Sequence, residues 1–131
     1  MAERRTINAL LDAARARLDR LEPAAAFAEL RSGTLLIDTR CEDLRREEGV
    51  IPGSIHVPLS VLYWRLDPAS GHENPAIADP DRPLMLICAH GYSSSLAAAT
   101  LHDMGFSRAT DVVGGFEAWA AAGLPIERAL T

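Results

Sequence analysis

Short apolar runs alternate along this chain with stretches in which apolar residues recur every three or four positions. The apolar runs that predict buried strands lie at 34–38, 84–87 and 110–113, and a short alternating strand is predicted within 51–58. The helical spacings lie at 6–21, 23–33, 96–104 and 114–123. Strands that alternate with helices predict an α/β fold in which helices cover both faces of a parallel sheet.

The segments between these elements are polar or rich in proline. The stretch DTRCEDLRREEG, which starts at Asp38, is strongly polar. Ser60 can cap a short helix that continues through Leu66. Residues 67–83 contain several prolines and no periodicity, so they predict a long surface connection.

Residues 6–21 predict an amphipathic helix with one apolar face to bury. Its apolar positions are Ile7, Leu10, Leu11, Ala14, Leu18 and Leu21. The helix either packs on its own domain or serves dimerisation or a partner. We therefore expect an N-terminal helix within residues 1–22 and one domain over residues 23–131.

The composition is that of one ordinary globular domain. The 131 residues are 48% hydrophobic and 24% charged, which is enough apolar material for one core. A formal net charge of -5, spread along the chain, predicts neither a nucleic-acid nor a membrane partner. The sequence has no signal-peptide pattern and no apolar stretch long enough to span a bilayer, so we expect a cytoplasmic protein.

The two cysteines, Cys41 and Cys88, lie far apart and belong to no CxxC or Cys/His cluster. Neither a metal site nor a disulfide framework is therefore expected, and a reducing cytosol fits best.

Cys88 ends the apolar run 84–87 and is followed by a short polar loop and a helix. In an open parallel sheet, ligands bind at the carboxyl ends of the strands, where loops lead into helices. Unpaired loop amides and the dipole of a helix that begins near Ser94 attract anions there. A thiol in that place has its pKa lowered from about 8.5, which makes Cys88 a candidate nucleophile. Its position alone also fits a small core residue.

The residues after Cys88 favour the nucleophile. Gly91 permits a positive φ, so the backbone can curve around an atom attached to the sulfur. Ser93 and Ser94 supply hydroxyl donors and a helix cap. The residues expected to surround the sulfur are Ala89, His90, Gly91, Tyr92, Ser93 and Ser94. A phosphate-binding P-loop lacks its GK[ST] here, and a Cys/His/Asn protease lacks matching residues around the cysteine.

Four segments, in order, resemble the rhodanese-like domain, and specifically its single-domain thiosulfate sulfurtransferases. They are LLIDTR at 35–40, GVIPGSIHVPLS at 49–60, CAHGYSS at 88–94 and GGFEAWAAAGLPI at 114–126. The resemblance implies a central parallel sheet of about five strands, flanked by helices on both faces. The N-terminal helix lies outside it and contains none of the candidate catalytic groups, so we expect it to matter for stability or association only.

The same resemblance implies a sulfurtransferase. Cys88 would take a sulfane sulfur from thiosulfate or from a small or protein-bound persulfide, hold it as a persulfide, and pass it to cyanide or another thiophilic acceptor. The six-residue loop from Cys88 to Ser93 has the length associated with sulfur transfer in this family. A thiolate that already exists needs no general base, and no cofactor is expected. The expected partners are small sulfur donors and acceptors, or a protein that carries a persulfide or thiol.

Other residues receive supporting or structural interpretations. Asp38 and Arg40 resemble the family's Asp-x-Arg pair behind the site, and we interpret them as a structural ion pair in which Arg40 can also attract an anion. His90 either binds a donor or is an exposed spectator. Cys41 shows no activation, so we expect a bystander and not a thiol that resolves the persulfide. The residues assigned to packing or the core are His56, Trp64 and Trp119.

The loop departs from many family members in one respect. Ala89, Tyr92 and Ser93 leave it without the arginine, lysine or threonine found elsewhere, so thiosulfate would be held mainly by backbone dipoles and the physiological donor stays open. A phosphatase on this fold needs Cys-x5-Arg, and position 94 is a serine. The alternative to an enzyme is a binding or regulatory module that keeps the fold without turnover, and the intact Cys88 argues against it.

Overall fold

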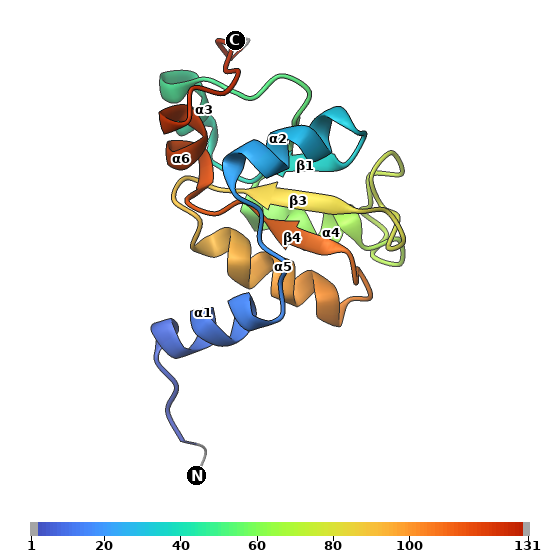
Figure 1. The fold of residues 1–131 in the computed structure, drawn as a ribbon. Coiled ribbons are helices and arrows are strands. Elements are labelled where there is room, and N and C mark those ends of the chain that lie inside the picture. The colour runs from blue at the N-terminus through green and yellow to red at the C-terminus, as the bar shows by residue number, and fades with distance from the viewer. Residues whose placement is uncertain (1–2, 130–131) are drawn as a thin grey trace.

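A parallel sheet forms the centre of the computed structural model, which describes residues 3–129. Within those residues, the strands in sheet order are β2 (Ile55–His56), β1 (Leu35–Asp38), β3 (Leu84–Ile87) and β4 (Ala109–Asp111), all parallel (Figure 1). A single parallel bridge between Leu21 and Val112 extends the sheet beyond β4. The predicted α/β fold is confirmed, and the fifth strand that the resemblance implied is reduced here to this bridge.

Helices cover both faces of the sheet (Figure 1). They are α1 (Ile7–Ala16), α2 (Pro23–Arg31), α3 (Glu42–Glu48), the 3-10 turn η1 (Leu59–Val61), α4 (Leu62–Leu66), α5 (Ser93–Asp103) and α6 (Gly115–Ala121). The helices α2 and α6 lie on one face, α4 and α5 lie on the other, and α1 packs on the outer side of α5. The ends of the predicted ranges 1–22 and 23–131, residues 1–2 and 130–131, lie outside the described residues.

The alternation of side chains along the strands creates two cores. The face toward α4 and α5 buries Leu35, Ile37, Leu84 and Leu86 against Leu62, Leu66, Ala97 and Leu101. The face toward α2 and α6 buries Leu36, Met85 and Ile87 against Ala26, Phe116 and Trp119. The central strand β3 is therefore apolar at every position, and β1 is apolar up to its last residue, Asp38, as a parallel sheet with two covered faces requires.

The N-terminal helix is shorter than its periodicity predicts. It ends at Ala16 rather than continuing to Leu21, because the backbone of Leu21 joins the sheet edge. The Leu21 N–H donates to the Asp111 carbonyl at 3.1 Å, and the Val113 N–H donates to the Leu21 carbonyl at 2.9 Å. Pro23 also disfavours helical backbone at the preceding residue, Glu22, which is extended.

Two further local expectations were wrong. Trp64 is 53% exposed, because Leu62 and Leu66 take the buried face of α4, whereas Trp119 is fully buried as predicted. Ser60 lies within η1 and caps nothing, since Val61 precedes α4 without a side-chain cap. The polar stretch after Asp38, for which no element is predicted above, forms α3, a helix with no buried residue that apolar periodicity therefore does not reveal.

The start of α6 packs directly on the loop that follows β3. Gly115 has φ +63°, and a Cβ there would lie 2.5 Å from the Cys88 carbonyl oxygen and 2.8 Å from the Gly91 nitrogen. Backbone atoms cannot move aside as a flexible side chain can. Gly123 also has a positive φ, of +73°, but an added Cβ would meet nothing within 4 Å.

These two glycines make a matched test of that packing. Both alanine variants carry the strain of a left-handed backbone, about 1–2 kcal/mol. Gly115→Ala should lower the free energy of unfolding by about 2 kcal/mol more than Gly123→Ala, because only the former forces backbone apart. Denaturant unfolding of both variants measures the difference. Equal losses would show that the loop and α6 are not in close contact.

Candidate active site

Cys88 directly follows β3 and begins the loop that leads into α5. The residue is only 6% exposed. The Gly91 N–H donates to Cys88 Sγ at 3.1 Å, and Ser94 Oγ lies 3.2 Å from the same sulfur. Gly91 has φ +84°, a conformation that glycine adopts without strain. The loop therefore curves around a nearly buried sulfur.

The pKa of Cys88 lies below its ordinary value. Burial alone raises the pKa, because it penalises the thiolate. Hydrogen bonds from the side chains of Ser94 and Ser93 and from the backbone of Ser94 and Gly91 act in the opposite direction and together outweigh burial. The sulfur is therefore a better anion than an ordinary buried thiol, which suits a nucleophile.

The loop turns its carbonyl groups away from the sulfur. The Cys88 carbonyl accepts from the Phe116 N–H at 2.8 Å and the Ala89 carbonyl accepts from the Glu117 N–H at 3.1 Å, both at the start of α6. The Gly91 carbonyl accepts from two arginines outside the loop, Arg15 at 2.8 Å and Arg20 at 3.2 Å. With these acceptors engaged elsewhere, the sulfur faces donors.

The predicted helix cap does not form at the start of α5. Tyr92 occupies the N-cap position without a side-chain cap, and Ser93 and Ser94 are the first helical residues. The hydroxyl of Ser94 instead donates to Asp111 Oδ2 at 2.7 Å, and that of Ser95 donates to the same oxygen at 2.8 Å. Competition from the buried Asp111 carboxylate explains why the cap expectation was wrong.

Apolar periodicity does not identify Asp111, Arg15 or Arg20 as neighbours of the site. Asp111 ends β4, next to β3, so a carboxylate at the end of a neighbouring parallel strand was the available signal. Arg15 and Arg20 are two of several arginines in the N-terminal segment, and their spacing singles out neither. Their contacts with the loop do not fit an N-terminal helix that serves stability or association only. The division into residues 1–22 and 23–131 stays a prediction.

Asp38 and Arg40 form a buried ion pair at the end of β1. Arg40 Nη2 lies 2.8 Å from Asp38 Oδ2, and the Arg40 side chain has no exposed surface. The guanidinium also donates to the Gly49 carbonyl at 2.8 Å and stacks 3.7 Å from the ring centroid of Phe116 on α6. His56 Nε2 lies 2.8 Å from the Arg40 carbonyl. Through Arg40 and Phe116, the pair therefore connects the end of β1 to α6.

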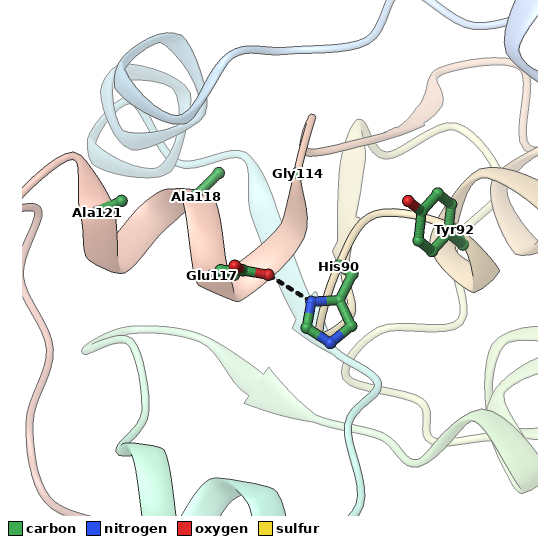
Figure 2. Close-up of a pocket in the computed structure, with 6 residues that line it drawn as sticks. All are labelled: His90, Tyr92, Gly114, Glu117, Ala118 and Ala121. Atoms are coloured by element: carbon green, nitrogen blue, oxygen red, sulfur yellow. Dashed lines mark hydrogen bonds and ion pairs between the residues drawn. The ribbon is translucent and has the colours of Figure 1, made fainter.

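A pocket of about 440 Å³ lies beside the loop, between it and α6. Its lining residues are His90, Tyr92, Gly114, Glu117, Ala118 and Ala121. Figure 2 shows His90 pointing toward Glu117, with Tyr92 on the side away from α6. His90 Nδ1 lies 2.6 Å from Glu117 Oε2, so this exposed histidine links the loop to α6.

Residues 22–122 match the family described as the rhodanese-like domain. The chain belongs to the rhodanese-like domain family. It is 39% identical over 102 residues to the thiosulfate sulfurtransferase GlpE of Pseudomonas savastanoi pv. phaseolicola, over 78% of this chain and 87% of that protein. These similarities identify this rhodanese-like protein as an enzyme of the sulfurtransferase class.

Two solved structures of similar proteins extend the comparison into the N-terminal segment. A protein of unknown function from Rhodopseudomonas palustris, described as a possible tyrosine phosphatase, has a TM-score of 0.87 at 35% identity, over 97% of this chain and 98% of that chain. The polysulfide-sulfur transferase homodimer from Wolinella succinogenes has a TM-score of 0.73 at 26% identity, over 93% of this chain and 87% of that chain.

The rhodanese-like loop of this chain has no phosphatase arginine. The position that would hold the Cys-x5-Arg guanidinium is Ser94, which is fully buried and bonded to Asp111. The guanidinium groups of Arg15 and Arg20 contact the loop, but they do so at the Gly91 carbonyl.

The remaining observations concern the rest of this rhodanese-like chain. Cys41 is exposed and Cys88 buried, and both are free thiols. Over residues 3–129, no group of three His, Cys, Asp or Glu side chains is arranged to hold a metal ion. In the same part of the chain, no helix has the length and apolarity needed to cross a membrane.

The lowered pKa of Cys88 can be measured in the Cys41→Ser variant, in which Cys88 is the only thiol. Titration of the ultraviolet thiolate absorbance should give a midpoint below that of the same variant unfolded in denaturant. Adding Ser94→Ala should raise the midpoint by roughly one pH unit, because a side-chain donor to the thiolate is lost.

The matched control is Thr100→Ala, which removes an exposed hydroxyl from the same helix. It should leave the Cys88 midpoint unchanged. A folded protein whose Cys88 titrates at or above the midpoint of the unfolded chain would contradict the described site.

Proposed function

We propose that this enzyme transfers sulfane sulfur through a persulfide on Cys88. The observation that carries the proposal is the sulfur of Cys88, which has a lowered pKa and accepts the Gly91 N–H at 3.1 Å. A site that stabilises a thiolate at this position also suits the terminal sulfur anion of a persulfide, because both are negatively charged.

In the first step, the Cys88 thiolate attacks the sulfane sulfur of the donor. A new S–S bond forms between Cys88 Sγ and that sulfur, and the bond that held the sulfur in the donor breaks. The leaving group departs with the electron pair of that bond, as sulfite when the donor is thiosulfate. No proton is transferred, so the step needs no general base once the thiolate exists.

In the second step, a thiophilic acceptor attacks the outer sulfur of the persulfide. The bond between this sulfur and Cys88 Sγ breaks, and its electron pair returns to Cys88 as the thiolate. Cyanide would leave as thiocyanate, and a thiolate would leave as a new persulfide. The donors around Sγ stabilise the leaving thiolate and make the second step favourable as well.

The donor is a sulfane sulfur compound, either thiosulfate or a persulfide on a small molecule or protein. The relatives named above are a thiosulfate sulfurtransferase and a polysulfide-sulfur transferase. The loop itself contains no arginine or lysine, and the Glu117 carboxylate that lines the adjacent pocket pairs with His90. The lack of a fixed cation in the loop favours donors other than small dianions. Cys41 and Cys88 are both free thiols, which fits a reducing compartment, and we propose the cytoplasm.

A binding or regulatory module is the alternative to an enzyme. A module without turnover has no need for a thiol with a lowered pKa, and Cys88 combines such a pKa with hydrogen bonds from the loop. This combination favours turnover.

Two cysteine variants test the proposal. Wild-type protein incubated with thiosulfate, and separately with a small persulfide, should gain the mass of one sulfur atom, which a reductant removes. Cys88→Ser should show no gain and no turnover but should still fold, because serine fits the loop and cannot hold a sulfane sulfur.

Cys41→Ser is the matched control, because it removes the other, exposed thiol. It should keep the adduct and most of the activity. An inactive Cys41→Ser variant would assign the chemistry to the wrong thiol. The lack of any adduct on wild-type protein with all donors would favour the module.

A further inference from the structure

Two arginines of the N-terminal segment contact the active-site loop from its carbonyl side. Arg15, on α1, donates through Nη2 to the Gly91 carbonyl at 2.8 Å and through Nε to Ser95 Oγ at 3.2 Å. Arg20, which follows α1, donates through Nη2 to the same Gly91 carbonyl at 3.2 Å. This carbonyl belongs to the residue whose N–H donates to the Cys88 sulfur. The arginines therefore hold the peptide group that directly follows the one whose N–H contacts the sulfur.

Arg20 also neutralises the carboxylate of Asp111, which accepts the hydrogen bond of the Ser94 hydroxyl beside Cys88. Its guanidinium binds both oxygens of Asp111, Nε to Oδ1 at 2.8 Å and Nη2 to Oδ2 at 3.2 Å. Asp111 is fully buried, and the Arg20 side chain is 16% exposed. A buried carboxylate without a cationic partner would repel a thiolate one hydroxyl group away.

The Ser94 hydroxyl lies between these two anions. Its oxygen is 3.2 Å from Cys88 Sγ, and its proton is donated to Asp111 Oδ2 at 2.7 Å. When the Cys88 proton leaves to solvent, the thiolate needs the Ser94 proton as a donor. Asp111 Oδ2 can release it, because Ser95 and Arg20 remain as donors to that oxygen.

The two arginines lie outside the region that matches the rhodanese-like domain, which begins at residue 22. We propose that Arg15 and Arg20 are positioning residues for Cys88, and that the N-terminal segment completes the active site by holding Gly91 and neutralising Asp111. This inference rests on the proposed function only for its effect on sulfur transfer. Its effect on the thiol is independent of any donor.

Two other pairs of ionisable side chains near the loop have no contact with Arg20. They are the ion pair of Asp38 and Arg40 at the end of β1 and the pair of His90 and Glu117 between the loop and α6. A change in the titration of Cys88 on removing Arg20 therefore reports the contacts of Arg20 itself, with Asp111 and with the Gly91 carbonyl.

The test compares Arg20→Gln with Arg17→Gln, both in the Cys41→Ser chain. Arg17 belongs to the same segment but pairs with Asp103 at the surface, where both side chains are largely exposed. Arg20→Gln should raise the thiolate midpoint of Cys88 by roughly one pH unit, and persulfide formation near neutral pH should slow about tenfold. Arg17→Gln should match the Cys41→Ser chain in both measurements.

A second substitution separates positioning from simple loss of stability. Adding Asp111→Asn to Arg20→Gln removes the uncompensated charge, so the midpoint should return most of the way toward its original value. A role in stability alone predicts no such recovery, since the double variant lacks both partners of the ion pair. If Arg20→Gln fails to fold, Arg15→Gln replaces it as the test, because it leaves the ion pair of Arg20 and Asp111 intact. It should raise the Cys88 midpoint by a smaller amount, which lowers the thiolate fraction about threefold at a pH below the midpoint.

A folded Arg20→Gln protein with an unchanged midpoint would overturn the inference. So would an equal shift in Arg17→Gln, or an unchanged midpoint in Arg15→Gln when that variant serves as the test. If wild-type protein forms no persulfide, the proposed function fails, yet the titration of Cys88 still decides the role of the arginines.

Discussion

The active site depends on one constraint, which is that the loop after β3 must present N–H groups to the sulfur and send its carbonyl groups elsewhere. A carbonyl oxygen near a thiolate would repel it, and a buried carbonyl without a donor is itself unfavourable. The structure meets the constraint with two sets of donors. The N-terminal amides of α6 bind the carbonyls of Cys88 and Ala89, and Arg15 and Arg20 bind that of Gly91.

This constraint explains why distant segments converge on a short loop. Gly115 is required where α6 approaches, since a side chain would strike the loop backbone. The buried pair of Asp38 and Arg40 braces the neighbouring strand against the same helix through Phe116. The buried carboxylates of Asp38 and Asp111 each have an arginine partner. The loop amides are therefore left to stabilise the thiolate.

The sequence predicted the parts of the fold that depend on local patterns. Strands apolar at every position, such as Leu84–Ile87, and the loop after Cys88 follow from burial and from the position of strand ends. The helix α3 could not be predicted from apolar periodicity, because it has no buried residue. The exposure of Trp64 could not be predicted either, because it depends on which side of α4 packs inward. The contacts of Arg15 and Arg20 join residues more than 70 positions apart, which no local pattern encodes.

The most direct test of the central claim is a crystal structure of the protein after treatment with thiosulfate or a small persulfide. The account predicts one additional sulfur atom bonded to Cys88 Sγ, within hydrogen-bond distance of loop N–H groups or the serine hydroxyls, with the Cys88, Ala89 and Gly91 carbonyls still bonded to α6 and the arginines. An unmodified Cys88 beside a modified Cys41, or an added sulfur that faces loop carbonyls, would contradict it.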